Sequence, residues 1–110
     1  LSMKDETLYF QHILEAIEKI ERYLMNVSLE SFMFNDMQID AVVRELEIIG
    51  EAATNVSEAT RNKHLEIPWS KMIGMRNRLI HEYFGVNTKI VWETCASDLK
   101  ELKPLIKAVL

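Results

Sequence analysis

Hydrophobic residues recur at intervals of three and four over much of the chain, with polar residues between them. This spacing lines up one apolar face of an α-helix. A first run predicts a helix from about Asp5 to Met25, with apolar positions Phe10, Ile13, Ile17, Ile20 and Leu24. A second run predicts a long helix that starts at Asn35-Asp36. Its apolar positions are Ile39, Val42, Val43, Leu46, Ile49 and Ala53.

Glycine, proline and capping residues divide the rest of the chain. Gly50 lies inside the second helix, where we expect it to allow close approach of a neighbouring backbone. Ser28 and Ser57 are expected to begin short helical turns, the first running through Phe34. Pro68 is expected to begin a further helix. The packed side of that helix comprises Met72, Ile73, Leu79 and Ile80.

The end of the chain predicts one more helix. Gly85 is suited to end the preceding helix in a left-handed conformation, and Asn87 can cap the last one. Its apolar positions are Ile90, Val91, Ala96, Leu99 and Leu102. Pro104 should kink or split it. With no repeats or linkers, the pattern predicts an all-α fold, a four- or five-helix up-and-down bundle.

Composition agrees with this fold and sets limits on the function. The chain of 110 residues has 48% hydrophobic residues but only 3 Gly and 2 Pro, which favours long helices in one domain, residues 3–110. Leu1 and Ser2 precede Met3 and look like a cloning remnant. The single Cys95 excludes an internal disulfide and a cysteine-based metal cluster, and is expected to be a small core residue.

Charge and hydropathy predict a cytoplasmic protein that does not bind nucleic acid broadly and without selectivity. No apolar run approaches the roughly 20 residues that span a bilayer, and no signal peptide is recognisable, so we expect a soluble cytoplasmic protein with no membrane partner. The net charge of -4 argues against broad, non-selective nucleic-acid binding. A local basic cleft around Arg76 and Arg78 remains compatible with brief RNA contact, or with a partner protein that supplies its own positive surface.

The segment Gly74-Met75-Arg76-Asn77-Arg78-Leu79-Ile80-His81-Glu82-Tyr83-Phe84-Gly85 carries the candidate chemistry. It places an arginine, an amide, a histidine and a phenol at the end of an otherwise apolar helix. Arginine offers a fork of donors that fits a phosphate, and histidine exchanges protons near neutral pH. Such a set is suited to chemistry on a phosphodiester.

One regular helix cannot direct all of these groups to one point. At about 100° per residue, Asn77 and His81 lie about 40° apart, whereas Arg76 lies about 140° from His81 and about 20° from Tyr83. Either the helix loosens near Gly85, or two copies of the helix face each other so that each site draws on both chains. A twofold dimer would achieve the second arrangement.

The pattern R-x4-H-x-Y, from Arg76 through His81 to Tyr83 with Asn77 after the arginine, resembles the signature of the HEPN superfamily. Within that superfamily the chain is similar to HepT-type toxins. The resemblance extends to segments on both sides of the motif: Tyr9–Ile17, Arg44–Ala53, Ile67–Trp69, Val86-Asn87 and Ile90–Glu93. It implies a homodimer with its site in the cleft between subunits, and metal-independent RNA cleavage without a cofactor.

The resemblance also implies a role for each motif residue. His81 would move protons at the attacking 2′-hydroxyl or the leaving oxygen, and Arg76 would stabilise the phosphorane. Asn77 would orient the phosphate or the imidazole. The products would be a 2′,3′-cyclic phosphate and a 5′-hydroxyl. In HepT-type toxins an MNT-type nucleotidyltransferase, the antitoxin, adds AMP to the motif tyrosine, here Tyr83, and silences the toxin.

Simpler interpretations stand beside these. His81 could cap carbonyl groups at a helix end, Arg76 could pair with one of the many glutamates, and Arg78 could be a solvated side chain. The same surface could form a non-catalytic module that binds a nucleotide or docks a nucleotidyltransferase, or the bundle could be purely structural. His12 and His64 have no neighbours at zinc-like spacing, so no metal site is predicted. Packing roles are expected for Trp69, Trp92, Met33, Met37, Met72 and Met75.

Overall fold

A computed structural model describes residues 3–81 and 87–110. All regular secondary structure within these ranges is helical, which confirms the all-α prediction. The elements in chain order are α1 (Met3–Tyr23), α2 (Leu29–Met33), α3 (Asp36–Asn55), α4 (Glu58–Lys63), α5 (Trp69–His81), α6 (Thr88–Glu93), the π-helical turn η1 (Thr94–Asp98) and α7 (Leu99–Val109). No described helix is long and apolar enough to cross a membrane.

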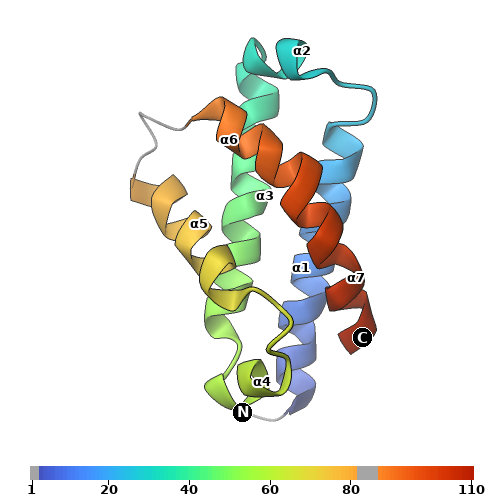
Figure 1. Ribbon diagram of the computed structural model, residues 1–110, viewed down its shortest axis with the longest axis vertical. Coiled ribbons are helices and arrows are strands. Elements are labelled where there is room, and N and C mark those ends of the chain that lie inside the picture. The colour runs from blue at the N-terminus through green and yellow to red at the C-terminus, as the bar shows by residue number, and fades with distance from the viewer. Residues whose placement is uncertain (1–2, 82–86) are drawn as a thin grey trace.

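Three long helices and one composite segment build the bundle. The helices α1 and α3 lie side by side in opposite directions, and α5 packs against α3 (Figure 1). The segment α6–η1–α7 then returns along the bundle, with α6 near α2 and α7 against α1. The short helices α2 and α4 lie at opposite ends of a molecule that measures 43 × 28 × 20 Å. This arrangement is the up-and-down bundle expected from the hydrophobic pattern.

Side-chain caps fix where four helices begin. The side-chain oxygens of Ser28, Asn35, Ser57 and Asn87 each accept a hydrogen bond from a backbone N–H in the first turn of the next helix, at 3.0 to 3.2 Å. These N–H groups have no partner inside the helix, so the cap satisfies them. All four predicted caps are confirmed. The predicted cap at Gly85 lies outside the described residues.

The apolar faces meet in one core between α1, α3 and the α6–η1–α7 segment. Its most deeply buried hydrophobic residues, with no exposed surface, are Ile13, Phe32, Val42, Ala53 and Ile106. Complete burial of a side chain such as Ile13 or Phe32 stabilises the fold by about 1.5–3 kcal/mol relative to leaving it exposed. The core therefore draws on residues from the first to the last helix, as expected for a single domain.

The last helical segment is not split at Pro104, which was one of the two predicted effects of the proline. The helix α7 continues through Pro104, from Leu99 to Val109, so the proline does not divide it. Leu102 and Ile106 on either side of the proline are both buried. The irregularity occurs earlier, at η1, where the N–H of Leu99 bonds to the carbonyl of Thr94 five residues back. Packing of the two flanking apolar residues holds α7 in place although one backbone donor is missing.

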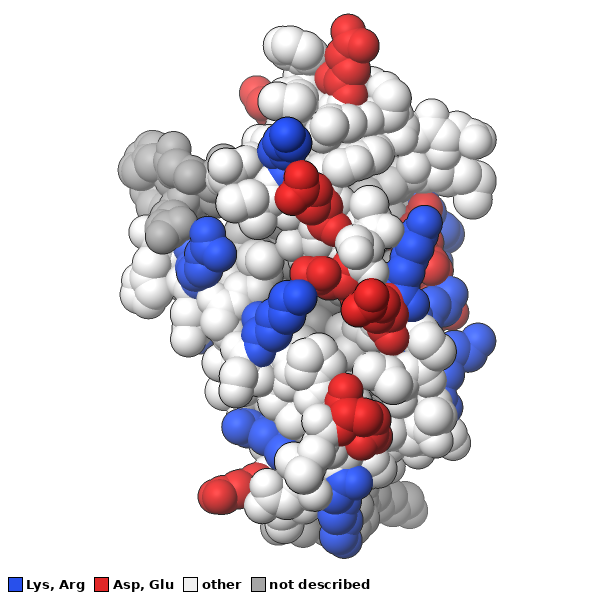
Figure 2. All heavy atoms as spheres, in the orientation of Figure 1, with Lys and Arg blue, Asp and Glu red and all other residues white. Residues whose placement is uncertain are grey.

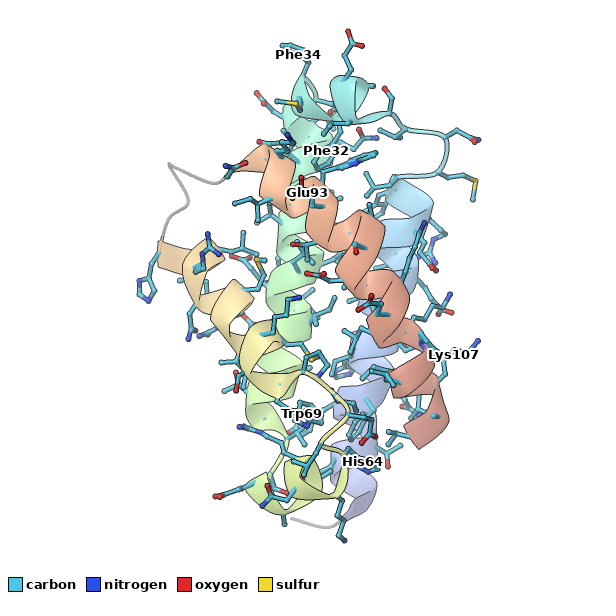
Figure 3. All side chains as sticks on the ribbon, in the orientation of Figure 1. Phe32, Phe34, His64, Trp69, Glu93 and Lys107 are labelled. Atoms are coloured by element: carbon cyan, nitrogen blue, oxygen red, sulfur yellow. The ribbon has the colours of Figure 1, made fainter. Side chains whose placement is uncertain are left out.

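Several apolar residues expected to pack are exposed. Met33 and Met37 are 46% and 84% exposed at the corner between α2 and α3. At this end of the bundle Phe32 turns inward, whereas Phe34 points away from the body of the molecule (Figure 3). The buried residue of the five-residue helix α2 is Phe32, and Met37 lies in the first turn of α3. Ala96, expected on the apolar face of the last helix, is also exposed.

Charged side chains of both signs are intermixed on the face of the bundle seen in Figure 2. Salt bridges also join helices: Lys71 lies 3.3 Å from Asp98, and Lys103 lies 2.8 Å from Glu21 and 3.9 Å from Glu18. This face therefore carries no broad basic surface of the kind that coats nucleic acid.

Candidate functional site

The motif helix α5 is anchored at its N-terminal end. Trp69 is 7% exposed, and its indole Nε1 donates a hydrogen bond to the carbonyl of His64 at 3.0 Å. Its ring meets that of Phe10 edge-on, with centroids 5.8 Å apart. Figure 3 shows His64 and Trp69 together near α4. The predicted packing role of Trp69 is confirmed, and the anchor fixes the start of α5 relative to α1.

Further along, α5 approaches α3 unusually closely at Gly50. A Cβ atom placed on this glycine would lie 2.1 Å from the Cβ of Arg76, 2.8 Å from its Cγ and 3.0 Å from the carbonyl oxygen of Met72. The expectation that Gly50 permits close helix approach is therefore confirmed. The structure adds what the sequence did not indicate, namely that the residue opposite Gly50 is the motif arginine.

The structure also brings Arg76 and Asn77 together. Arg76 is half-buried, and its Nη1 donates a hydrogen bond to Oδ1 of Asn77 at 2.9 Å. Its Nε is buried and has no hydrogen-bond acceptor among the described residues. Within those residues Arg76 forms no ion pair, so the glutamate partner considered from the sequence is not found. A buried guanidinium N–H without an acceptor is costly, which sets Arg76 apart from an ordinary surface arginine.

His81 lies apart from this pair. It is exposed and ends α5, which is a regular α-helix from Trp69 to His81. No hydrogen bond links His81 to Arg76 or Asn77 in the part of the chain that the structure describes. Arg78 is exposed and makes no ion pair within the same part. Tyr83, the predicted modification site, and Gly85, where the helix might loosen, lie outside the described residues.

Hydrophobic residues next to the motif are incompletely covered. Ile80, expected on the packed side of α5, is 39% exposed, and Ile90 in α6 is 36% exposed. Leu79 beside Ile80 is buried, so the apolar face of α5 is only partly covered within one chain. The exposed positions lie on either side of residues 82–86 in sequence, Ile80 on the motif helix α5 and Ile90 on α6.

The other histidines have structural surroundings. His12 is exposed on α1. The Nδ1 of His64 lies 3.5 Å from a carboxylate oxygen of Glu66, and its ring packs edge-on against Phe10. Among residues 3–81 and 87–110, no group of three His, Cys, Asp or Glu side chains is placed to hold a metal ion.

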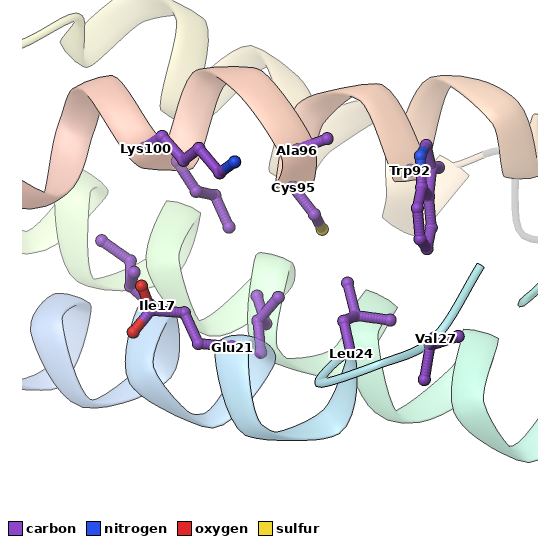
Figure 4. A pocket seen from close by; sticks show the side chains of 10 residues that line it. Ile17, Glu21, Leu24, Val27, Trp92, Cys95, Ala96 and Lys100 are labelled. Carbon is purple, nitrogen blue, oxygen red and sulfur yellow. The ribbon is translucent and has the colours of Figure 1, made fainter. Parts of the chain in front are cut away.

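A cavity that the sequence did not predict lies away from the motif. It has a volume of about 300 Å³ between α1 and the α6–η1–α7 segment. Figure 4 shows Trp92 and Cys95 on one side of it and Leu24 and Val27 on the other. Burial raises the pKa of the Cys95 thiol to about 12, with a further contribution from the negative charge of Asp98. The thiol is therefore protonated at neutral pH and is no nucleophile.

Comparison with known proteins gives the chain a family. Residues 13–109 match the family described as ribonuclease HepT-like. A protein of Caldanaerobacter subterraneus subsp. tengcongensis, named as a candidate RNase, is 43% identical over 108 residues, which cover 98% of this chain and 96% of that protein. A protein of Thermococcus cleftensis, named as a probable ribonuclease HepT, is 43% identical over 95 residues, covering 86% of each chain.

A further relative from Methanocaldococcus jannaschii, also named as a candidate RNase, is 33% identical over 109 residues, covering 99% of this chain and 100% of that protein. No solved structure matches the chain. The similarity to these relatives extends over nearly the whole bundle and is not confined to the motif in α5. The protein belongs to the ribonuclease HepT-like family.

Proposed function

We propose that this protein is a metal-independent endoribonuclease that uses Arg76 and His81 as catalytic residues. The observation that carries the proposal is the state of Arg76: its Nη1 is held by Asn77, and its buried Nε has no acceptor in the described structure. A guanidinium held in this way can bind two phosphate oxygens with little loss of side-chain entropy. The ribonuclease names of the relatives agree with an RNA substrate.

The proposed reaction is transfer of the phosphoryl group to a neighbouring hydroxyl. The 2′-oxygen of the RNA attacks phosphorus and loses its proton, the bond from phosphorus to the 5′-oxygen breaks, and that oxygen gains a proton. His81 transfers protons at one of these oxygens, and Arg76 stabilises the added negative charge of the phosphorane. Asn77 orients the guanidinium. The products are a 2′,3′-cyclic phosphate and a 5′-hydroxyl.

A twofold dimer completes the proposed site. Arg76 packs against α3, whereas His81 is exposed at the end of the same regular helix. A second chain related by a twofold axis can place its own His81 opposite the first chain's Arg76. The partly exposed Ile80 and Ile90 supply apolar surface for such a contact. Each cleft then draws its arginine from one subunit and its histidine from the other.

The test is RNA cleavage by the purified, unmodified protein and its variants. Arg76→Ala and His81→Ala should each lower the cleavage rate by about two to four orders of magnitude, because each removes a group that acts in the transition state. Arg78→Ala is the matched control: it removes an exposed arginine from the same helix and should cleave at nearly the wild-type rate. Full activity of His81→Ala would contradict the assigned mechanism.

A wild-type protein that cleaves no RNA would contradict the proposal and leave the non-catalytic alternatives, a module that binds a nucleotide or docks a nucleotidyltransferase, or a purely structural bundle. Titration of the same sample with a nucleotidyltransferase of the MNT type then measures that second function.

We also propose that the protein is the toxin of a toxin–antitoxin pair and is silenced at Tyr83. The phenol oxygen attacks the α-phosphorus of ATP on the partner nucleotidyltransferase, pyrophosphate leaves, and AMP remains on Tyr83. The added charge and bulk lie two residues from His81 and would repel RNA from the cleft.

Intact-mass measurement after incubation with the nucleotidyltransferase and ATP should show AMP-sized additions on the wild type and none on Tyr83→Phe. Tyr83→Phe should also keep its cleavage activity after incubation. An addition that persists in Tyr83→Phe would place the modification on another residue.

A further inference from the structure

We propose that Gly50 is a positioning residue for Arg76. Because Gly50 has no side chain, Cβ and Cγ of Arg76 pack directly against α3 at this position, and this contact, called the seat of Arg76, sets the orientation of the arginine. The inference rests on the proposed catalytic role of Arg76. It assigns a second helix to the site, because the motif itself lies only on and after α5.

The contact at Gly50 leaves no room for any other residue. Carbon atoms in contact ordinarily lie about 3.5–4.0 Å apart, whereas a Cβ at position 50 would lie 2.1 Å from the Cβ of Arg76 and 2.8 Å from its Cγ. The Cβ of Arg76 is fixed to the α5 backbone and cannot rotate away. A larger residue at position 50 must therefore shift α5, or that part of it, by more than an ångström.

Backbone conformation does not explain this glycine. Gly50 lies in the regular helix α3, and no described glycine has a positive φ angle. A glycine in a helix interior destabilises the helix relative to alanine. Close approach of Arg76 is the feature of the structure that requires Gly50.

The seat restricts the arginine at both ends of its side chain. The first two carbons of Arg76 lie against Gly50, and Nη1 donates to Asn77. Between these contacts Nε is buried and lacks an acceptor in the described structure. The guanidinium is thus preorganised by α3 on one side and by its neighbour in α5 on the other. Moving a catalytic group by about 1 Å can lower the reaction rate a hundredfold.

The chain offers a matched pair of substitutions to test this. Gly50→Ala and Gly74→Ala make the same chemical change in two packed helices, but a Cβ at Gly74 has no atom within 4 Å. Gly50→Ala should lower kcat for RNA cleavage about a hundredfold. Gly74→Ala should leave kcat unchanged and raise the melting temperature, because alanine favours the helix.

A role through Arg76 is separated from general damage by combining substitutions at both positions. In an Arg76→Gly background the overlapping Cβ and Cγ are absent, so Gly50→Ala should lower the melting temperature far less than in the wild type, with only the contact to the carbonyl oxygen of Met72 at 3.0 Å remaining. Cleavage should stay lost in the double variant. In an Arg76→Ala background, Gly50→Ala should cause no further loss of cleavage. The ¹⁵Nε–¹H NMR signal of Arg76 should shift in Gly50→Ala and stay in place in Gly74→Ala.

The outcomes distinguish this proposal from the proposed function. If Arg76→Ala cleaves RNA like the wild type, the catalytic role of Arg76 is wrong. The NMR signal and the melting temperatures then test on their own whether Gly50 positions Arg76. If Arg76→Ala is inactive but a folded Gly50→Ala cleaves at the wild-type rate, the positioning role is overturned. Should Gly50→Ala fail to fold, recovery of folding by adding Arg76→Gly supports the seat, and failure to recover contradicts it.

Discussion

Cys95 shows how strongly one residue's surroundings determine its chemistry in this bundle. It is 8% exposed at the wall of the cavity beneath η1, among aliphatic side chains and the ring of Trp92. Burial leaves an ionised thiolate poorly solvated there, and nearby Asp98 adds a like charge. The prediction that Cys95 is a small core residue is confirmed. Because the thiol is buried, its reactivity reports whether the bundle opens around the cavity.

Native protein should therefore resist alkylation. With a pKa of about 12, against 9.0 for an ordinary thiol, Cys95 should react with iodoacetamide at pH 8 about a thousandfold more slowly than in the unfolded chain. Mass spectrometry over a time course, with and without urea, measures both rates. Labelling of the native protein at the rate of the unfolded chain would show that the cavity wall is open to solvent.

For single residues, the helix caps predicted from the adjacent sequence are confirmed. Asn35 and Asn87 cap their helices because a cap depends on the next three residues. Met33 and Met37 were predicted to pack and are exposed, since exposure depends on which distant element covers a site. The contact between Gly50 and Arg76 joins two helices, and spacing along the chain could not identify it.

Among the elements, α1 and α4 are linked by a buried carboxylate. Glu6 is 3% exposed, and its carboxylate accepts hydrogen bonds from the backbone N–H of Ser57 at 2.6 Å and from the hydroxyl of Thr60. These bonds, that from Thr60 most strongly, hold the pKa of Glu6 below its usual 4.5. The carboxylate thus reinforces the Ser57 cap of α4 from the first helix, a contact that the sequence pattern did not predict.

This link should make stability depend on pH in the acid range. Because the pKa of Glu6 is lower in the folded state, the carboxylate stabilises the fold above pH 4.5, and this contribution is lost as the pH falls through the lower, folded-state pKa. Urea unfolding between about pH 6 and pH 3 should show a smaller loss of stability for Glu6→Gln than for the wild type. Glu6→Gln should also be less stable at neutral pH.

Glu15→Gln is the control for this measurement, because it removes an exposed carboxylate from the same helix. Its unfolding midpoint should follow that of the wild type across the pH range. If the free energy of unfolding fell equally with pH for Glu6→Gln and the wild type, protonation of Glu6 would not weaken the contact between α1 and α4.

For the whole molecule, the bundle followed from the spacing of apolar residues, because four amphipathic segments joined by short loops have few ways to bury their faces. The site did not follow to the same degree. Arg76 and Asn77 are joined by a hydrogen bond that helix geometry did not predict, and His81 lies apart on the surface. A second chain is proposed to complete the site, and the roles of its residues stay predictions.

Mixing two inactive variants tests a site shared between chains. In a dimer of one Arg76→Ala chain and one His81→Ala chain, one cleft lacks both groups and the other keeps both. Equal mixing after unfolding and refolding should therefore restore about a quarter of the wild-type activity, since half of the dimers carry one intact cleft of two. Sedimentation should show a dimer at micromolar concentration. No recovery from a dimeric mixture would place both groups of each site in one chain.

The π-helical turn η1 gives the last helical segment a tolerance to a change in chain length. It holds one more residue than an α-helical turn, and its Ser97 is exposed. Deleting Ser97 should close the turn into regular helix and leave Leu102 and Ile106 facing inward. Deleting exposed Glu101 from α7 would instead rotate the rest of that helix by about 100° and turn Ile106 toward solvent. Thermal melts should separate the two deletions, with cooperative unfolding kept only in the first. The bundle can thus lose a residue at one point of its final segment without losing the alignment of its core.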